Sequence, residues 1–200
     1  MGTTKISGMS PATTPLTGAE LLEVSQLSGG TYTTYNTSSA SLAFAGAKYG
    51  SFYDVTDQTG SISAATAVKF GTGDIASKGV TVVASGGNKT RITYSAAGTY
   101  MISPSLQFVN SGSSDYDVTV WLAKNGTAIP ASATSVTVPK LSDGGSAFFT
   151  SVFYVTVTAG QYIEIMWLPE NAAITLEHTA AGAIAPAIPS AIVVTERIDL

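Results

Sequence analysis

The chain has 200 residues, a net charge of −4 and no cysteine, which excludes disulfides and thiolate metal sites and leaves no basic surface for nucleic acid. Hydrophobic residues make up 44% of the sequence and charged residues only 11%, where ~25% charged is typical of globular domains. Serine and threonine form about a quarter of the chain, a composition that favours β-structure with hydroxyl-rich surfaces. No apolar run is long enough for a membrane helix, so membrane insertion is not expected.

The first 17 residues are rich in threonine, proline, glycine and serine. Only Ile6, Met9 and Leu16 are available to pack, and such a segment does not fold alone. It suits a strap that lies on the surface of a partner, and it equally suits a disordered tail. The sequence leaves both interpretations open.

A short apolar run at 19–26 fits either a strand or one helical turn, and a glycine turn and the run TYTTY follow it. A small helix is predicted at 38–46, where a threonine or serine can cap SASLAFAGA. We interpret residues 1–49 as a short, mostly irregular appendage. Residues 50–200 form the main domain.

From Gly50 onward, short runs rich in valine, isoleucine, threonine and aromatic residues alternate with glycine turns. The first of these runs are SFYDVTD, ATAVKFG, GVTVVA and TRITYS. Later runs are SVTVP, AFFTSVFYVTVT, QYIEIMWL, AITLEH and AIVVTERI, with a loop at AAGAIAPAIPS. In two of these runs we expect the following residues on inward faces: Phe149, Phe153, Val155, Val157, Ile163, Ile165 and Trp167. No helical period of useful length appears, which predicts an all-β antiparallel domain of about 8–10 strands in the jelly-roll sandwich pattern.

The stretch 98–129 is the piece around which this domain is expected to be organised. It places two strand-like runs on either side of a polar, Gly/Ser-rich turn, and we expect the two runs to form a central antiparallel hairpin. Alternation places the following side chains on inward faces: Tyr100, Ile102, Leu106, Phe108, Val118, Val120 and Leu122. The dipeptide Asn125-Gly126 closes the second run with a strong short hairpin signal.

The residues for enzyme chemistry are sparse. His178 is the only histidine, and its neighbour Glu177 would point to the opposite face of an extended strand. With a single histidine and no cysteine, the sequence offers no obvious partners for His178 in a catalytic site with an activated nucleophile or in a zinc site. We expect no catalytic residues, no cofactor and no enzymatic activity, with His178 at a surface or an interface.

Acidic and aromatic side chains leave two further questions open. Asp54 and Asp57 flank a turn, and Asp115 and Asp117 share one face, but no calcium-loop motif is present. The simpler interpretation is that these acidic side chains lie in loops and face water, and the alternative is that they bind a structural calcium ion. Several aromatic residues, Trp121 among them, fit a carbohydrate-stacking surface or, more simply, core and subunit contacts.

The order AGTYMISPSLQF, VTVWLAKNGTAIPAS, VTVTAGQYIEIMW and PSAIVVTERI resembles the jelly-roll module of the complement-type and tumour-necrosis-factor-like superfamily. The similarity is to the version found in virion proteins of tailed bacteriophages, and it covers about 50–200. The resemblance implies a homotrimer with aromatic and apolar side chains buried around a three-fold axis. We expect Phe52, Tyr53, Phe148 and Tyr154 at or near that trimer interface.

The N-terminal KISGMSPATTPLTGAELLEVSQ is similar to the attachment leader of many phage tail, fibre and decoration proteins. This resemblance implies that the segment binds the major capsid protein or another virion protein through its apolar residues, which are Ile6, Met9, Leu16, Leu21 and Leu22. A protein on the virion surface follows, as capsid decoration, cement protein or short head fibre. The alternative is a tail-fibre or baseplate module that binds a host glycan or protein.

Overall fold

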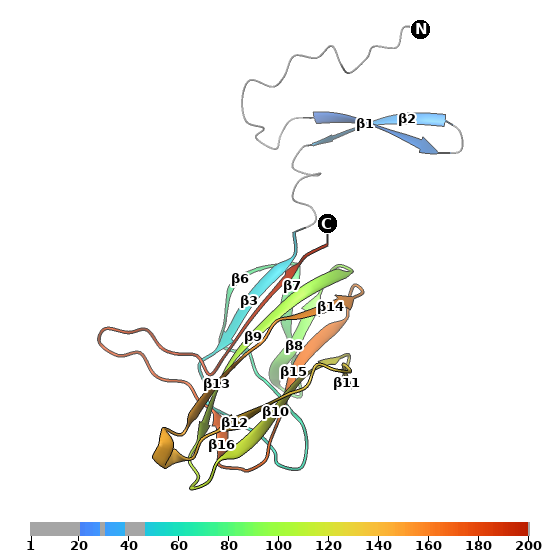
Figure 1. Cartoon of the computed structure of the whole chain (residues 1–200). Coiled ribbons are helices and arrows are strands. Elements are labelled where there is room, and N and C mark those ends of the chain that lie inside the picture. Colours follow the sequence, from blue (N-terminus) through green and yellow to red (C-terminus); the bar gives the residue numbers. More distant parts are fainter. Residues whose placement is uncertain (1–20, 29–30, 39–46, 200) are drawn as a thin grey trace. The chain divides into compact units, whose positions relative to one another are not determined.

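Two compact units, Met1–Ala47 and Lys48–Leu200, make up the computed structural model, which describes residues 21–28, 31–38 and 47–199. In the first unit β1 (Leu21–Ser28) pairs antiparallel with β2 (Thr31–Ser38), in a register that runs from Leu21 opposite Ser38 to Ser28 opposite Thr31 (Figure 1). Residues 21–26 of the apolar run at 19–26 are therefore in a strand rather than a helical turn. The helix predicted at 38–46 lies outside the described residues, except that its first residue ends β2.

The first sheet of the second unit is built on β9 (Gly98–Asn110), and we call it the β9 sheet. Its other strands are β3 (Tyr49–Asp54), β4 (Gln58–Thr59), β6 (Gly73–Lys78), β13 (Ser146–Thr150), β14 (Phe153–Val157), β16 (Ile174–Leu176) and β17 (Ala191–Arg197). One edge of β9 pairs with β13 and β14, and the other edge pairs with β16 and β17. Buried and half-buried residues alternate along all of β9, as a strand between a core and a second surface requires.

The second sheet, the β15 sheet, packs face to face with the first (Figure 1). Its strands are β5 (Thr66–Ala67), β7 (Val80–Ser85), β8 (Asn88–Tyr94), β10 (Tyr116–Lys124), β11 (Thr127–Ala128), β12 (Thr134–Val138) and β15 (Tyr162–Pro169). A short 3-10 helix, η2 (Leu141–Asp143), connects β12 to β13. All the pairings between these strands are antiparallel, which confirms the predicted all-β jelly-roll sandwich.

The prediction of a central hairpin in the stretch 98–129 is wrong, because β9 and β10 belong to different sheets. The inward faces were predicted correctly, since Tyr100 and Leu106 of β9 and Val118 and Val120 of β10 are all fully buried. Alternation identifies the buried face of a strand but not its hydrogen-bonded neighbour. The Gly/Ser-rich link therefore crosses from one sheet to the other, and the two strands meet across the core.

Two other strands differ from the sequence interpretation. The run AFFTSVFYVTVT is divided at residues 151–152 into β13 and β14, and both parts pair with β9. The segment GDIASK forms β6 at the edge of the β9 sheet, although it has little strand propensity. Its side chains are mostly exposed, so the alternation that reveals a half-buried strand is missing.

The Asn125-Gly126 turn was predicted correctly. It connects β10 to β11, with Ala123 opposite Ala128 and Lys124 opposite Thr127. Both turn residues have positive φ, 50° for Asn125 and 81° for Gly126. This is the type I′ geometry that follows the twist of two antiparallel strands, and it explains why asparagine and glycine occupy these positions.

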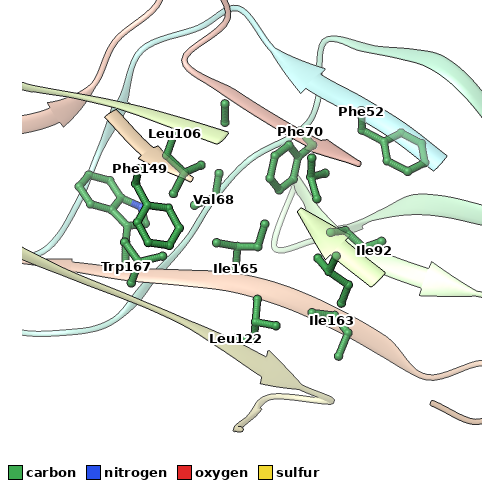
Figure 2. Close-up of a cluster of buried hydrophobic side chains, with 14 of the residues drawn as sticks. Phe52, Val68, Phe70, Ile92, Leu106, Leu122, Phe149, Ile163, Ile165 and Trp167 are labelled. Atoms are coloured by element: carbon green, nitrogen blue, oxygen red, sulfur yellow. The ribbon is translucent and has the colours of Figure 1, made fainter. Parts of the chain in front are cut away.

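Side chains from both sheets form one hydrophobic core. Figure 2 shows Trp167 and Ile165 of β15 and Phe149 of β13 among them. Phe52 on β3 lies in the same core and is only 3% exposed. The predicted inward residues of the later runs are also found there, with Phe153 partly buried against the core: Phe149, Phe153, Val155, Val157, Ile163, Ile165 and Trp167.

Candidate interaction surfaces

The acidic side chains are used to hold loops in place. Asp54 is buried and accepts hydrogen bonds from the backbone N–H groups of Gly71 (2.7 Å) and Thr56 (2.9 Å). Asp115 accepts the backbone N–H of Lys140 at 2.8 Å. Within residues 21–28, 31–38 and 47–199, no three histidine or carboxylate side chains are grouped in a way that could hold a metal ion.

His178 contacts Asp57, a residue 121 positions earlier in the chain. The backbone N–H of His178 donates to Oδ1 of Asp57 at 3.0 Å, and the ring Nδ1 lies 2.7 Å from the same oxygen. Its neighbour Glu177 is engaged elsewhere, since it accepts the hydroxyl of Thr175 at 3.0 Å. The pair fixes the start of the loop between β16 and β17 against the loop after β3.

These bonds give a pH prediction for Asp57. The backbone N–H of His178, followed by its side chain, holds the pKa of the Asp57 carboxyl below its usual value of 3.8. Because the pKa is lowered in the folded state, the pair stabilises the loop above the usual pKa of aspartate. That contribution is lost as the pH falls through the lowered value, and it is small because both side chains are partly exposed.

Carbon-13 NMR of the Asp57 carboxyl group should show a titration midpoint below 3.8. In His178→Ala the midpoint should rise toward 3.8 without reaching it, because alanine keeps the backbone N–H. A midpoint at or above 3.8 in the unaltered protein would contradict the contact.

The solvent-facing sides of β3, β9, β13, β14 and β17 are poor in charge and partly apolar. We call this surface the outer β9 face and define it by the outward side chains of β3, β9, β13, β14 and β17. It presents Tyr49, Ser51, Tyr53, Thr99, Met101, Ser103, Ser105, Gln107, Val109, Phe148, Thr150, Tyr154, Thr156, Ile192, Val194 and Glu196. On these strands, which the structure describes in full, Glu196 is the only charged member of the face.

Strand register places apolar and polar side chains side by side on this face, and it also pairs Ile192 of β17 with Tyr53 of β3. Tyr154 of β14 lies opposite Met101 of β9, which in turn lies opposite Glu196 of β17. One step further along, Val194 lies opposite Ser103. Phe148 and Tyr154 are 60% and 65% exposed, values far above those of core aromatics. Exposed aromatic side chains on a face with almost no charge are typical of surfaces that bind other protein.

A groove lies at the β14 edge, between that strand and the β10–β11 turn. We call it the β14 groove; its volume is ~420 Å³, and it is lined by Lys124, Thr127, Ala128, Ile129, Pro130, Tyr154, Val155 and Thr156. Its lysine is already engaged, because Nζ donates to the backbone carbonyl of Thr156 at 3.2 Å. The groove therefore offers a mostly apolar surface.

The four predicted interface residues lie in three different environments. Phe52 is in the core of the domain, so its side chain is not available for a subunit contact (Figure 2). Tyr53 is half-buried on the outer β9 face, and Phe148 and Tyr154 are exposed on the same face. Phe52 and Tyr53 were both expected at the interface, but neighbouring residues of a strand point to opposite faces, so the expectation for Phe52 is wrong. The burial of position 52 follows from the packing of β3 against β7.

The predicted attachment residues fall in the first unit. Ile6, Met9 and Leu16 lie outside the described residues. Leu21 and Leu22 are on β1, opposite Ser38 and Thr37 of β2. Their role in attachment stays a prediction.

The sequence prediction missed the projecting character of the loop between β16 and β17. The available signal is the run AAGAIAPAIPS, which is mostly apolar and carries no charge but predicts no more than a loop. The structure describes no helix with the length and hydrophobicity needed to cross a membrane.

No family model matches the sequence, and no curated protein matches it. Among solved structures the chain is similar to crystal structures of murine APRIL at pH 8.5, pH 8.0 and pH 5.0, with 10%, 10% and 9% identity. Each comparison covers 76% of this chain and 99% of that chain, with a TM-score of 0.47. The fold assignment itself rests on the strand pairing described above.

Proposed function

We propose that this chain is a non-enzymatic structural protein of a tailed-phage virion, a trimeric knob attached to the particle through its N-terminal segment. The observation that carries the trimer is the outer β9 face, which presents exposed aromatic residues and a single charge across five strands. Such a surface suits an obligate interface, because obligate interfaces are rich in apolar contacts, as the core of a domain is. The virion context comes from the sequence resemblances of the N-terminal segment and of the domain.

Capsid decoration, as a cement protein or a short head fibre, is the role that we favour. In the sequence only residues 39–48 separate β2 from β3, which are too few to build the long shaft of an extended fibre. A knob on so short a connection would sit close to the capsid exterior. Its partners would be two other copies of the chain and the major capsid protein.

Quantitative mass spectrometry of purified virions tests this role. A copy number of the same order as the major capsid protein is expected for decoration, because the shell offers many equivalent sites. A few trimers per particle would move the protein to the tail, and complete absence would overturn the virion assignment.

The attachment segment can be tested in the same particles. A variant with Met9, Leu16 and Leu21 replaced by aspartate should be absent from virions, because charged side chains cannot pack where apolar ones did. Normal incorporation of this variant, with a correctly folded domain, would overturn attachment through the N-terminal segment.

One observation favours the alternative of a receptor-binding module in the tail. The loops 110–115 and 141–146 are hydrogen-bonded to each other, with Leu141 N–H donating to Gly112 O (3.0 Å) and Asn110 N–H to Gly145 O (2.7 Å). Leu141 is nevertheless 60% exposed at this ordered end of the domain. Glycan binding by the isolated domain, or a block of phage adsorption by it, would support this alternative over decoration.

A further inference from the structure

The loop between β16 and β17 forms a projecting finger, which we define as residues 179–189. It extends away from the sandwich in Figure 1, and none of its residues is charged. Ile184 is fully exposed near its tip, and Ile188 is 44% exposed. An isoleucine held in water with nothing to cover it is unfavourable by ~1.5–3 kcal/mol relative to a buried one. The finger therefore has the composition of a segment that is buried in a complex.

The finger is ordered by its own hydrogen bonds. Thr179 and Ile188 exchange two backbone bonds, with Thr179 N–H donating at 2.9 Å and Ile188 N–H donating at 2.8 Å. Gly182 N–H donates to Ala185 O at 3.0 Å and closes the tip. The His178–Asp57 contact fixes the base. A segment held in this way loses little conformational entropy when it binds.

The finger and the β14 groove lie at opposite edges of the β9 sheet. Strand β14 flanks β9 on one side, and β17, β3 and β6 follow on the other. The base of the finger lies over this second side, where Pro186 and Pro189 line a hollow together with Tyr53 of β3 and Ile75 of β6. One copy therefore carries an apolar projection at one edge and an apolar groove at the other, as Figure 1 shows for the finger and for β14.

Two different patches at opposite edges produce a head-to-tail contact, which closes into a ring when the rotation between copies allows it. We infer that the finger of one copy inserts Ile184 into the β14 groove of the next copy and so locks the trimer. A second copy is favoured because neither surface has a free charge or an array of polar side chains to recognise a glycan. The groove is also continuous with the outer β9 face through Tyr154, which belongs to both. The inference rests on the proposed trimer.

Because the chain has no cysteine, engineered cysteines can test this contact directly. Ala128→Cys places a thiol in the lining of the groove, and Ile184→Cys places one near the tip of the finger. With a short bismaleimide cross-linker, the double variant should give covalent trimers on a denaturing gel. The two single variants, co-expressed, should give covalent dimers, and each alone should give none. The control variant carries Ile62→Cys in place of Ala128→Cys. Ile62 is also exposed, but its cysteine should not cross-link to that of Ile184→Cys.

The outcomes separate this inference from the proposed function. A trimer by light scattering that does not cross-link would overturn the finger contact and leave the proposed trimer standing. Cross-linking of Ile184→Cys to itself would also overturn it, because the fingers would then meet each other. A monomer would overturn both the trimer and the finger contact.

A charge at the fingertip provides a second measurement. Ile184→Asp should raise the dissociation constant of the trimer at least tenfold, because the aspartate would have to lose its water in an apolar groove. Ile62→Asp introduces the same charge at another exposed isoleucine and should leave the constant unchanged. Equal constants for the two variants would contradict the inference.

Discussion

Trp167→Ala is expected to lower the free energy of unfolding by about 3–5 kcal/mol, because a buried aromatic side chain is removed and a cavity remains. The indole of Trp167 on β15 is fully buried, and its ring centroid lies 5.6 Å from that of Phe108. The packing around it is tight: a Cβ at Gly60 would lie only 2.8 Å from Cη2 of Trp167. Chemical denaturation followed by circular dichroism would measure the change.

Trp167→Phe is the matched variant for this experiment. Within the described part of the chain the indole N–H of Trp167 has no hydrogen-bond partner, although it is buried. Phenylalanine keeps one aromatic ring and removes this unsatisfied donor, which offsets part of the lost packing. We expect a loss clearly smaller than that of Trp167→Ala. Equal losses would mean that the site does not depend on aromatic packing.

Aspartate at both Phe148 and Tyr154 is expected to convert the proposed trimer to monomers while the domain stays folded. Both side chains are exposed in the single copy, so the substitution leaves the core intact. Each buried aromatic contributes ~1.5–3 kcal/mol to an interface, and the added charges would have to lose their hydration there. The dissociation constant should rise by at least ~100-fold, which analytical ultracentrifugation can measure.

Ile62 and Val83 provide the matched control, since they are exposed hydrophobic residues away from the outer β9 face. Aspartate at both positions adds the same charge and should leave the trimer intact. If the control also dissociated the trimer, net charge rather than this face would be responsible. If the Phe148 and Tyr154 variant stayed trimeric, the outer β9 face would not be the subunit interface.

Local features of this protein can be predicted from the order of its residues. Alternation identified the buried faces of β9, β10 and β15, because a strand packed on one side must place every second residue in the core. The positive φ angles at Asn125 and Gly126 follow from residue types that tolerate them, so that turn was also readable. Exposed aromatic residues could be proposed as interface residues, but Phe52 shows that residue type alone does not distinguish an interface from a core.

The pairing of strands and the position of surfaces, in contrast, are set by contacts between distant parts of the chain. The pairing of β9 with β13, β14, β16 and β17, rather than with β10, depends on contacts between residues far apart in the sequence, which the period of a strand does not encode. The contact of His178 with Asp57 joins positions 121 residues apart in the same way. The finger and the β14 groove lie near opposite edges of the β9 sheet. This relation depends on the order of the strands in the sheet, which no single strand encodes.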